Sequence, residues 1–118
     1  MIDPQANLVE NLFTDKMEQV PTRNGYGEGL VEAGRRNENV VALCADLTES
    51  TRTEAFKKEF PDRFIEIGVA EQNLVTVASG LAAVGKIPFV SSYGAFCPGR
   101  CWEQIRTTIS INNVPVKI

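Results

Sequence analysis

Apolar residues in this chain fall into short continuous runs, and the stretches between them carry apolar residues at helical spacing. The run Val40–Ala45 is apolar throughout, as is expected of a strand that is buried on both faces of a sheet. Similar runs predict further strands at Phe64–Ile67, Ile87–Ser92 and Val114–Ile118. The pattern predicts helices at about residues 22–36, 53–60, 71–84 and 100–111.

This alternation of strands and helices predicts an α/β fold of three layers, α/β/α, with a mostly parallel sheet in the middle. Ligands of such sheets bind beyond the carboxyl ends of the strands. The loops after the first three predicted strands, at residues 46–51, 68–73 and 92–99, should therefore lie along one edge. We expect the functional residues in these loops.

Residues 1–20 form a separate segment at the start of the chain. Its apolar residues are spaced as on one face of a helix: Leu8, Val9, Leu12, Phe13, Met17 and Val20. We expect an amphipathic lead-in helix here that docks on another surface. Residues 21–118 are expected to form the domain, and the glycines of its first helix should permit close approach of a neighbouring backbone or ligand.

Composition and charge exclude several classes of function. The 118 residues suffice for one domain with a modest core, and the formal net charge is −3. The sequence has no basic cluster that would indicate a nucleic-acid partner. It also has neither a signal peptide nor a run of about 20 apolar residues that would indicate a membrane protein. We therefore expect a cytoplasmic protein without nucleic-acid or membrane partners.

The absence of histidine limits the chemistry that the chain can perform. Nucleophiles activated by histidine are excluded, so acid–base work must fall to carboxylates or to a bound group. The cysteines Cys44, Cys97 and Cys101 are odd in number, and the gap between the last two fits no common zinc pattern. We interpret them as free thiols and expect no metal site on this chain.

The segment Asp62–Asn73 is the most informative part of the sequence. A short strand leads to Gly68, and Glu71 then enters the first turn of a strongly apolar helix. A carboxylate at this place either complements the positive end of the helix dipole or is kept in a dry site for chemistry. The surrounding motifs decide between the two interpretations.

Several motifs occur in order along the chain: Ala45-Asp46-Leu47-Thr48-x-Ser50, Asp62-Arg63-Phe64, Gly68-Val69-Ala70-Glu71-Gln72-Asn73, Gly85-Lys86-Ile87-Pro88-Phe89-Val90-Ser91 and Gly99-Arg100-x-Trp102-Glu103-Gln104-Ile105-Arg106. Together they closely resemble the pyrimidine-binding domain of transketolases, especially the split, two-subunit kind. The resemblance covers residues 21–118. It implies a role in the transfer of a two-carbon ketol unit between sugar phosphates, with thiamine diphosphate as cofactor.

The resemblance also implies roles for single residues. Glu71 matches the glutamate that hydrogen-bonds the aminopyrimidine ring and so favours removal of the thiazolium proton. Tyr93 and Phe96 match the aromatic pair that walls this ring, where stacking contributes about 0.5–1.5 kcal/mol beyond area burial. Asp46 and Leu47 match residues on the cofactor and interface side. Asp46 is explained nearly as well as a loop residue that bonds its own turn.

Arg23 and Ser50 match positions that hold the terminal phosphate of the substrate, which suits a planar guanidinium and a hydroxyl. Taken alone, an arginine after Pro21-Thr22 is more often a solvated side chain. A third aromatic of the family has no counterpart here, because Pro98 or Gly99 stands at its position.

The family's diphosphate-binding domain carries a Gly-Asp-Gly…Asn pattern that this sequence lacks. The resemblance therefore implies that a partner chain holds the magnesium and the diphosphate, and that thiamine diphosphate is shared between the two chains. The partner is expected to be a diphosphate-binding transketolase subunit, a further copy of the chain, or both. The chain matches only the first half of a pyrimidine domain, and we expect it to be inactive alone and prone to associate.

Two alternatives stay open from the sequence. One is a subunit like 1-deoxyxylulose-5-phosphate synthase or the β subunit of 2-oxo acid dehydrogenases. Asn73 argues against the first of these, since the deoxyxylulose enzymes typically carry histidine there. The other is a non-catalytic interaction fragment, against which the retained Glu71 argues.

Overall fold

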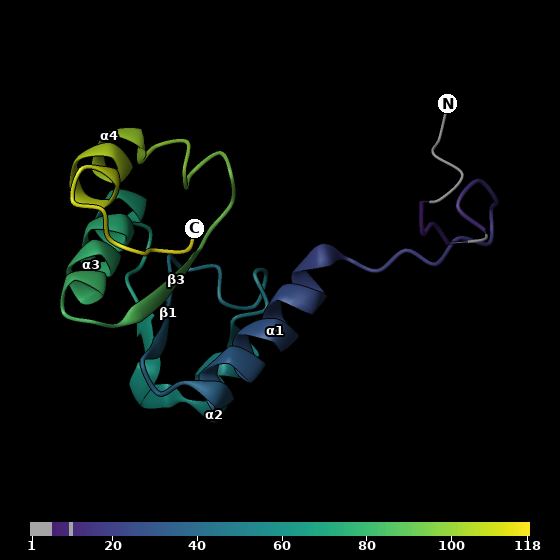
Figure 1. The fold of residues 1–118 in the computed structure, drawn as a ribbon, viewed down its shortest axis with the longest axis horizontal. Helices are drawn as coiled ribbons and strands as arrows, with labels where there is room; N and C mark the ends of the chain where they lie inside the picture. The colour runs from purple at the N-terminus through teal and green to yellow at the C-terminus, as the bar shows by residue number, and fades with distance from the viewer. Residues whose placement is uncertain (1–5, 10) are drawn as a thin grey trace.

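The computed structural model describes residues 6–9 and 11–118, which build a sheet between two layers of helices (Figure 1). The strands are β1 (Val40–Cys44), β2 (Phe64–Glu66) and β3 (Ile87–Ser91), in the order β2-β1-β3. Both pairings are parallel, with Leu43 of β1 opposite Ile65 of β2 and Val90 of β3. The predicted parallel α/β fold is confirmed.

The central strand β1 sends alternate side chains into two separate cores, and all five of its residues are buried. Val41 and Leu43 join one cluster, which includes Leu74. Val40 and Ala42 join a second cluster on the opposite face. Because successive side chains of a strand point to opposite faces, a continuous apolar run is what a strand covered on both sides requires.

Helices cover both faces of the sheet. On one face lie α1 (Thr22–Arg36) and α2 (Glu54–Glu59), with the short η1 turn (Pro61–Arg63) after them. On the other lie α3 (Glu71–Ala83) and α4 (Trp102–Gln104), which continues into η2 (Ile105–Ser110). None of the helices in the described residues is long and apolar enough to cross a lipid bilayer.

Two glycines of α1 allow the close approach that the sequence predicts. A Cβ on Gly27 would lie 2.7 Å from the carbonyl oxygen of Arg52, and one on Gly34 would lie 2.6 Å from the Phe56 ring. Gly25 and Gly29 have open space where a Cβ would stand. Only half of the glycines in this helix are therefore required by packing.

The last predicted helix widens along its length. Its second part, η2, is a π-helix rather than an α-helix. The hydroxyls of Thr107 and Thr108 donate to the carbonyls of Glu103 and Gln104, at 2.8 and 2.6 Å. Such bonds to the carbonyl four residues earlier compete with the helical ladder, which accounts for the wider turn.

The predicted strand at Val114–Ile118 forms only one parallel bridge, between Lys117 and Phe89 of β3. The Val90 N–H donates to the Lys117 carbonyl at 2.8 Å, and the Lys117 N–H donates to the Pro88 carbonyl at 3.0 Å. The segment therefore lies beside β3 as predicted, but it is not a regular strand.

The predicted lead-in helix is not found in residues 6–9 and 11–20, where the chain forms turns instead. Residues 1–5 and 10 of that prediction lie outside the described part. The Thr14 hydroxyl donates to the Asn11 carbonyl at 2.9 Å, and the Asn11 amide donates to the Lys16 carbonyl at 2.9 Å. These side chains replace helical bonds with local ones. Phe13 is 82% exposed, so its packing does not support a helix here.

Candidate functional site

All three strands point their carboxyl ends to one edge of the sheet, since they are parallel. The predicted loops at residues 46–51, 68–73 and 92–99 follow these ends directly. The arrangement confirms that the candidate functional segments share one edge, where parallel α/β sheets bind their ligands.

Glu71 is the first residue of α3, and it is only 6% exposed. It lines a hollow of about 600 Å³ together with Val69, Ala70, Gln72, Asn73 and Arg100. The neighbouring Gly68 adopts φ 75°, a conformation that glycine reaches at little cost, and this turn brings the chain from β2 into the helix. A buried acid thus stands at the positive end of a helix, at the edge where ligands are expected.

Arg100 links Glu71 to the aromatic residues of the last loop. Its Nη1 lies 3.9 Å from Oε2 of Glu71, and its guanidinium carbon lies 4.4 Å from the centre of the Phe96 ring. The Tyr93 and Phe96 rings are 6.0 Å apart between centres, at 32°. The predicted acid and the predicted aromatic pair are therefore brought together, with a cation between them.

A second hollow, of about 490 Å³, gathers three other predicted residues: Arg23, Ser50 and Tyr93. We call it the Arg23 pocket. Most of the remaining lining is hydroxylated, from Thr22, Tyr26, Thr51, Ser91 and Ser92. Arg23 supplies the one ionic side chain among the described residues that line it, the thiol of Cys97 aside. The predicted phosphate residues and one wall of the predicted ring site thus share a pocket.

Asp46 and Leu47 line neither hollow. Asp46 is exposed, with φ 55°, and its N–H donates to the Glu66 carboxylate. The Leu47 carbonyl accepts from both the N–H and the hydroxyl of Thr51, at 2.9 and 2.8 Å. In this chain both residues shape the loop after β1, and no contact of theirs assigns a cofactor role.

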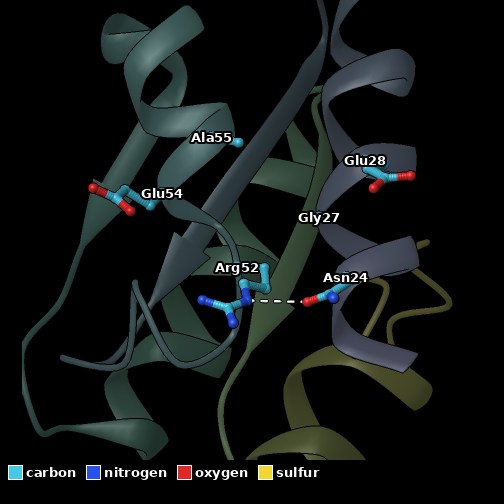
Figure 2. Close-up of a pocket in the computed structure, with 6 residues that line it drawn as sticks. All are labelled: Asn24, Gly27, Glu28, Arg52, Glu54 and Ala55. Carbon is cyan, nitrogen blue, oxygen red and sulfur yellow. Dashed lines mark hydrogen bonds between the residues drawn. The ribbon is translucent and has the colours of Figure 1, made fainter. Parts of the chain in front are cut away.

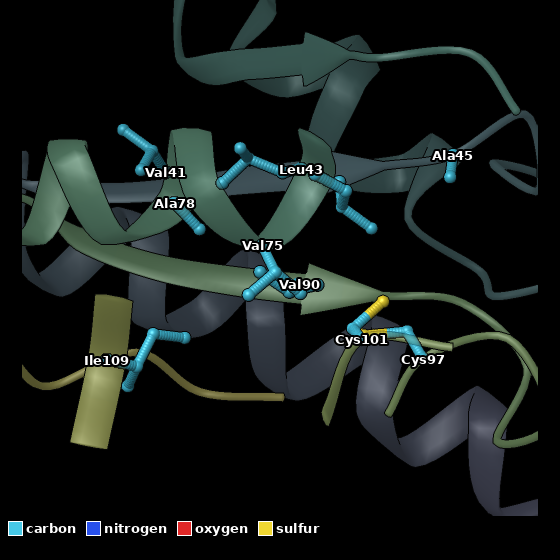
Figure 3. Close-up of a cluster of buried hydrophobic side chains, with 10 residues drawn as sticks. Val41, Leu43, Ala45, Val75, Ala78, Val90, Cys97, Cys101 and Ile109 are labelled. Carbon is cyan, nitrogen blue, oxygen red and sulfur yellow. The ribbon is translucent and has the colours of Figure 1, made fainter. Parts of the chain in front are cut away.

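Cys97 and Cys101 lie close together at the end of β3 (Figure 3). Burial raises the pKa of the Cys97 thiol to about 12, and the neighbouring Cys101 thiol adds to the effect. Burial also raises the pKa of Cys101. Both thiols therefore stay protonated and act as small apolar groups in the core cluster that includes Leu74.

A further hollow, of about 220 Å³, lies between α1 and α2 (Figure 2). It is lined by Asn24, Gly27, Glu28, Arg52, Glu54 and Ala55, none of which the sequence singles out as a site. Nε of Arg52 donates to Oδ1 of Asn24 at 3.1 Å. This contact joins the loop after β1 to α1.

Sequence reasoning missed three residues of this edge. Arg100 belongs to a recognised motif, but its contact with Glu71 could not be inferred from spacing. Glu66 accepts hydrogen bonds from two loops, and its only signal is an acid at the end of a short strand. Ser92 carries a buried hydroxyl that has no hydrogen-bond partner. The sequence contains no sign of this.

Comparison with protein families identifies the domain. A family model described as the transketolase pyrimidine-binding domain matches residues 18–118. A putative transketolase C-terminal section of Methanocaldococcus jannaschii is 53% identical over 96 residues, which cover 81% of this chain and 30% of that protein. The 6-deoxy-6-sulfo-D-fructose transketolase subunit SqwH of Clostridium sp. is 38% identical over 106 residues, which cover 90% of this chain and 33% of that protein.

A solved structure agrees with these matches. A split-gene transketolase, described as an inactive β4 tetramer, superposes with a TM-score of 0.75 at 49% identity. The match covers 83% of this chain and 32% of that chain. The chain thus spans about a third of the length of these relatives. By sequence and by fold, the chain belongs to the transketolase family, within its pyrimidine-binding domain.

Proposed function

We propose that this chain supplies the pyrimidine side of a transketolase active site, in a complex that transfers a two-carbon ketol unit between sugar phosphates. The burial of Glu71 at the start of α3, at the carboxyl edge of the sheet, carries the proposal. An acid kept from water there suits a hydrogen bond to a ring nitrogen better than an ion pair at the surface.

The described residues fit an aminopyrimidine ring. Glu71 would form the hydrogen bond to the ring nitrogen, and Tyr93 and Phe96 would wall the ring. Thiamine diphosphate, when bound, supplies the thiazolium carbon that accepts and passes on the ketol unit. Arg100 lies over Phe96 and beside Glu71, so it must make room for a ring that stacks there or form one of its walls.

The Arg23 pocket supports a site for the substrate. Arg23 would pair with the terminal phosphate, and Ser50 would donate a hydrogen bond to it. The name of one relative gives a sulfonated sugar, and a sulfonate presents the same kind of anionic oxygens to an arginine.

The active site needs a diphosphate-binding domain as well, since a pyrimidine site alone leaves the diphosphate and its magnesium unbound. We propose that a diphosphate-binding transketolase subunit supplies that domain, with further copies of this chain in the assembly. The relative described as a β4 tetramer supports self-association, and its description as inactive accords with a subunit that needs a partner.

A tagged pull-down from the native lysate tests the proposal, with the recovered complex assayed for ketol transfer in the presence of thiamine diphosphate and magnesium. Glu71→Gln should lower turnover at least about a hundredfold, on the scale of general acid–base catalysis. Glu38→Gln, at an exposed position before β1, is the control for the loss of one carboxylate charge. Full activity of the Glu71 variant would show that another group activates the cofactor.

A further inference from the structure

Ser92 has a hydroxyl that the protein buries and leaves without a partner. Among the described residues, Ser92 Oγ and Gln104 Oε1 are the buried side-chain oxygens that lack a hydrogen bond. A buried polar atom without a partner destabilises the fold, so such atoms are rare and call for an explanation. Ser92 follows β3 directly and lines the Arg23 pocket.

Neighbouring hydroxyls in this pocket already have partners within the protein. Tyr26 and Ser91 share a hydrogen bond at 2.5 Å between their hydroxyl oxygens. The Thr51 hydroxyl donates to the Leu47 carbonyl at 2.8 Å. The first contact joins α1 to β3, and the second lies within the loop after β1. Ser92 differs from them, since its hydroxyl has no hydrogen-bond partner among the described residues.

We propose that the Ser92 hydroxyl binds a hydroxyl group of the sugar phosphate, beside the phosphate held by Arg23 and Ser50. The inference rests on the proposed function and adds a sugar-contacting residue to it. Such binding requires the hydroxyl, which is buried in this structure, to turn toward the pocket about the Cα–Cβ bond. The bound ligand then supplies the hydrogen-bond partner that the Ser92 hydroxyl lacks within the protein.

The composition of the pocket favours this class of ligand. It combines one cationic side chain with many hydroxyl groups, and no side chain among the described residues that line it is a carboxylate. A small molecule with one anionic end and several hydroxyls matches that lining, because serine can donate to one sugar oxygen and accept from another. An apolar ligand would leave the Ser92 hydroxyl unpaired and gain nothing from Arg23.

Ser92→Ala separates a binding role from a structural one. In the complex with its partner subunit, we expect the KM for ribose 5-phosphate to rise about tenfold with kcat little changed, which corresponds to one lost hydrogen bond. Inhibition by inorganic phosphate should be unchanged. In the absence of sugar phosphate, the variant should unfold at the same temperature as the wild type or higher, because the unpaired hydroxyl is gone.

Ser91→Ala is the matched control. It removes the partner of Tyr26, so it should lower the unfolding temperature without sugar phosphate. The inference is overturned if Ser92→Ala lowers the unfolding temperature as Ser91→Ala does, or if the KM of Ser92→Ala for ribose 5-phosphate is unchanged. It is also overturned if inhibition by inorganic phosphate weakens by the same factor as the KM for ribose 5-phosphate rises.

A second readout does not depend on turnover. Ribose 5-phosphate should raise the unfolding temperature of the wild-type complex more than that of the Ser92→Ala complex. If the wild-type complex shows neither ketol transfer nor this stabilisation, the proposed function itself fails. If the wild type shows both and the variant equals it, only the role of Ser92 fails.

Discussion

The carboxylate of Glu66 accepts a hydrogen bond from the backbone N–H of Asp46, at 2.7 Å. The same oxygen accepts from the N–H of Gly68 at 2.9 Å, and the other oxygen accepts from the Thr48 hydroxyl at 2.9 Å. One side chain therefore ties the loop after β1 to the turn that leads into Glu71. The geometry of the candidate site depends on this connection between loops.

Replacement of Glu66 by alanine should destabilise the fold. Because Glu66 is exposed, water can satisfy the freed donors, so we expect a loss of only about 1 kcal/mol in the free energy of unfolding. Urea denaturation measures the loss. Glu38→Ala, at an exposed position before β1, is the control and should change the free energy by less than about 0.5 kcal/mol. Equal effects of the two variants would contradict the role of Glu66.

The contribution of Glu66 should also depend on pH. Partial burial raises the pKa of this carboxyl, but the hydrogen bonds from Asp46, Gly68 and Thr48 together bring it below its ordinary value. The stabilisation is therefore complete above the unfolded-state pKa of about 4.3 and is lost as the pH falls through the lower folded-state pKa. The difference between wild type and Glu66→Ala should be constant near neutral pH and shrink in acid. If the difference in stability between the two proteins grows in acid, the pKa of Glu66 is not lowered by folding.

The sheet was predictable because burial on both faces leaves a clear trace in the sequence. Val40–Cys44 is apolar at every position for this reason. The helix predicted before α1 is not found in the described residues, because apolar residues at helical spacing do not by themselves stabilise a helix. Asn11 and Thr14 satisfy backbone groups locally, and the side chain of Phe13 is left largely exposed.

The candidate site was predictable only in part. The motif residues in the loops that follow the strands lie at the expected edge, because parallel strands fix where these loops emerge. Contacts between distant residues, such as Arg100 with Glu71, depend on side-chain directions that spacing does not give. The unpaired state of Ser92 is likewise a property of the packed structure.

Gly34→Ala should destabilise α1 against α2. The added Cβ would lie 2.6 Å from Phe56 and 2.7 Å from Phe60, both aromatic carbons in a packed core. We expect a loss of about 1–3 kcal/mol in unfolding free energy, as is typical of overpacking. In Gly29→Ala nothing lies within 4 Å of the new Cβ, and the better helix former should add up to about 1 kcal/mol. Thermal unfolding of both variants should therefore shift in opposite directions, and a common direction would contradict the packing.

Arg63→Lys should also weaken the core beside α1. Nη1 of Arg63 donates to the carbonyls of Gly34 and Asn37, each at 3.0 Å, and the guanidinium lies 3.9 Å from the centre of the Phe60 ring. An ammonium cannot stack on the ring as a planar guanidinium does while it bonds both carbonyls. We expect a loss of about 1–2 kcal/mol by urea denaturation.

The matched control for Arg63 is Arg36→Lys. Arg36 is exposed and pairs with Glu32 at the surface, where ion pairs contribute at most about 1 kcal/mol. This variant should be nearly as stable as the wild type. If Arg63→Lys is equally mild, the guanidinium contacts do not hold the end of α1.

Cys97 should resist alkylation in the folded chain. Burial, reinforced by the Cys101 thiol, raises the pKa of Cys97 to about 12, and only the thiolate attacks iodoacetamide. At pH 8 we expect labelling on the order of a thousandfold slower than for an unfolded cysteine with a pKa of about 8.5. The rate should rise with pH up to the folded-state pKa, as long as the fold persists. Mass spectrometry after timed quenching measures it, and full labelling in denaturant is the control. Rapid labelling at Cys97 with an unchanged circular dichroism spectrum would mean that the thiol is not buried as in this structure.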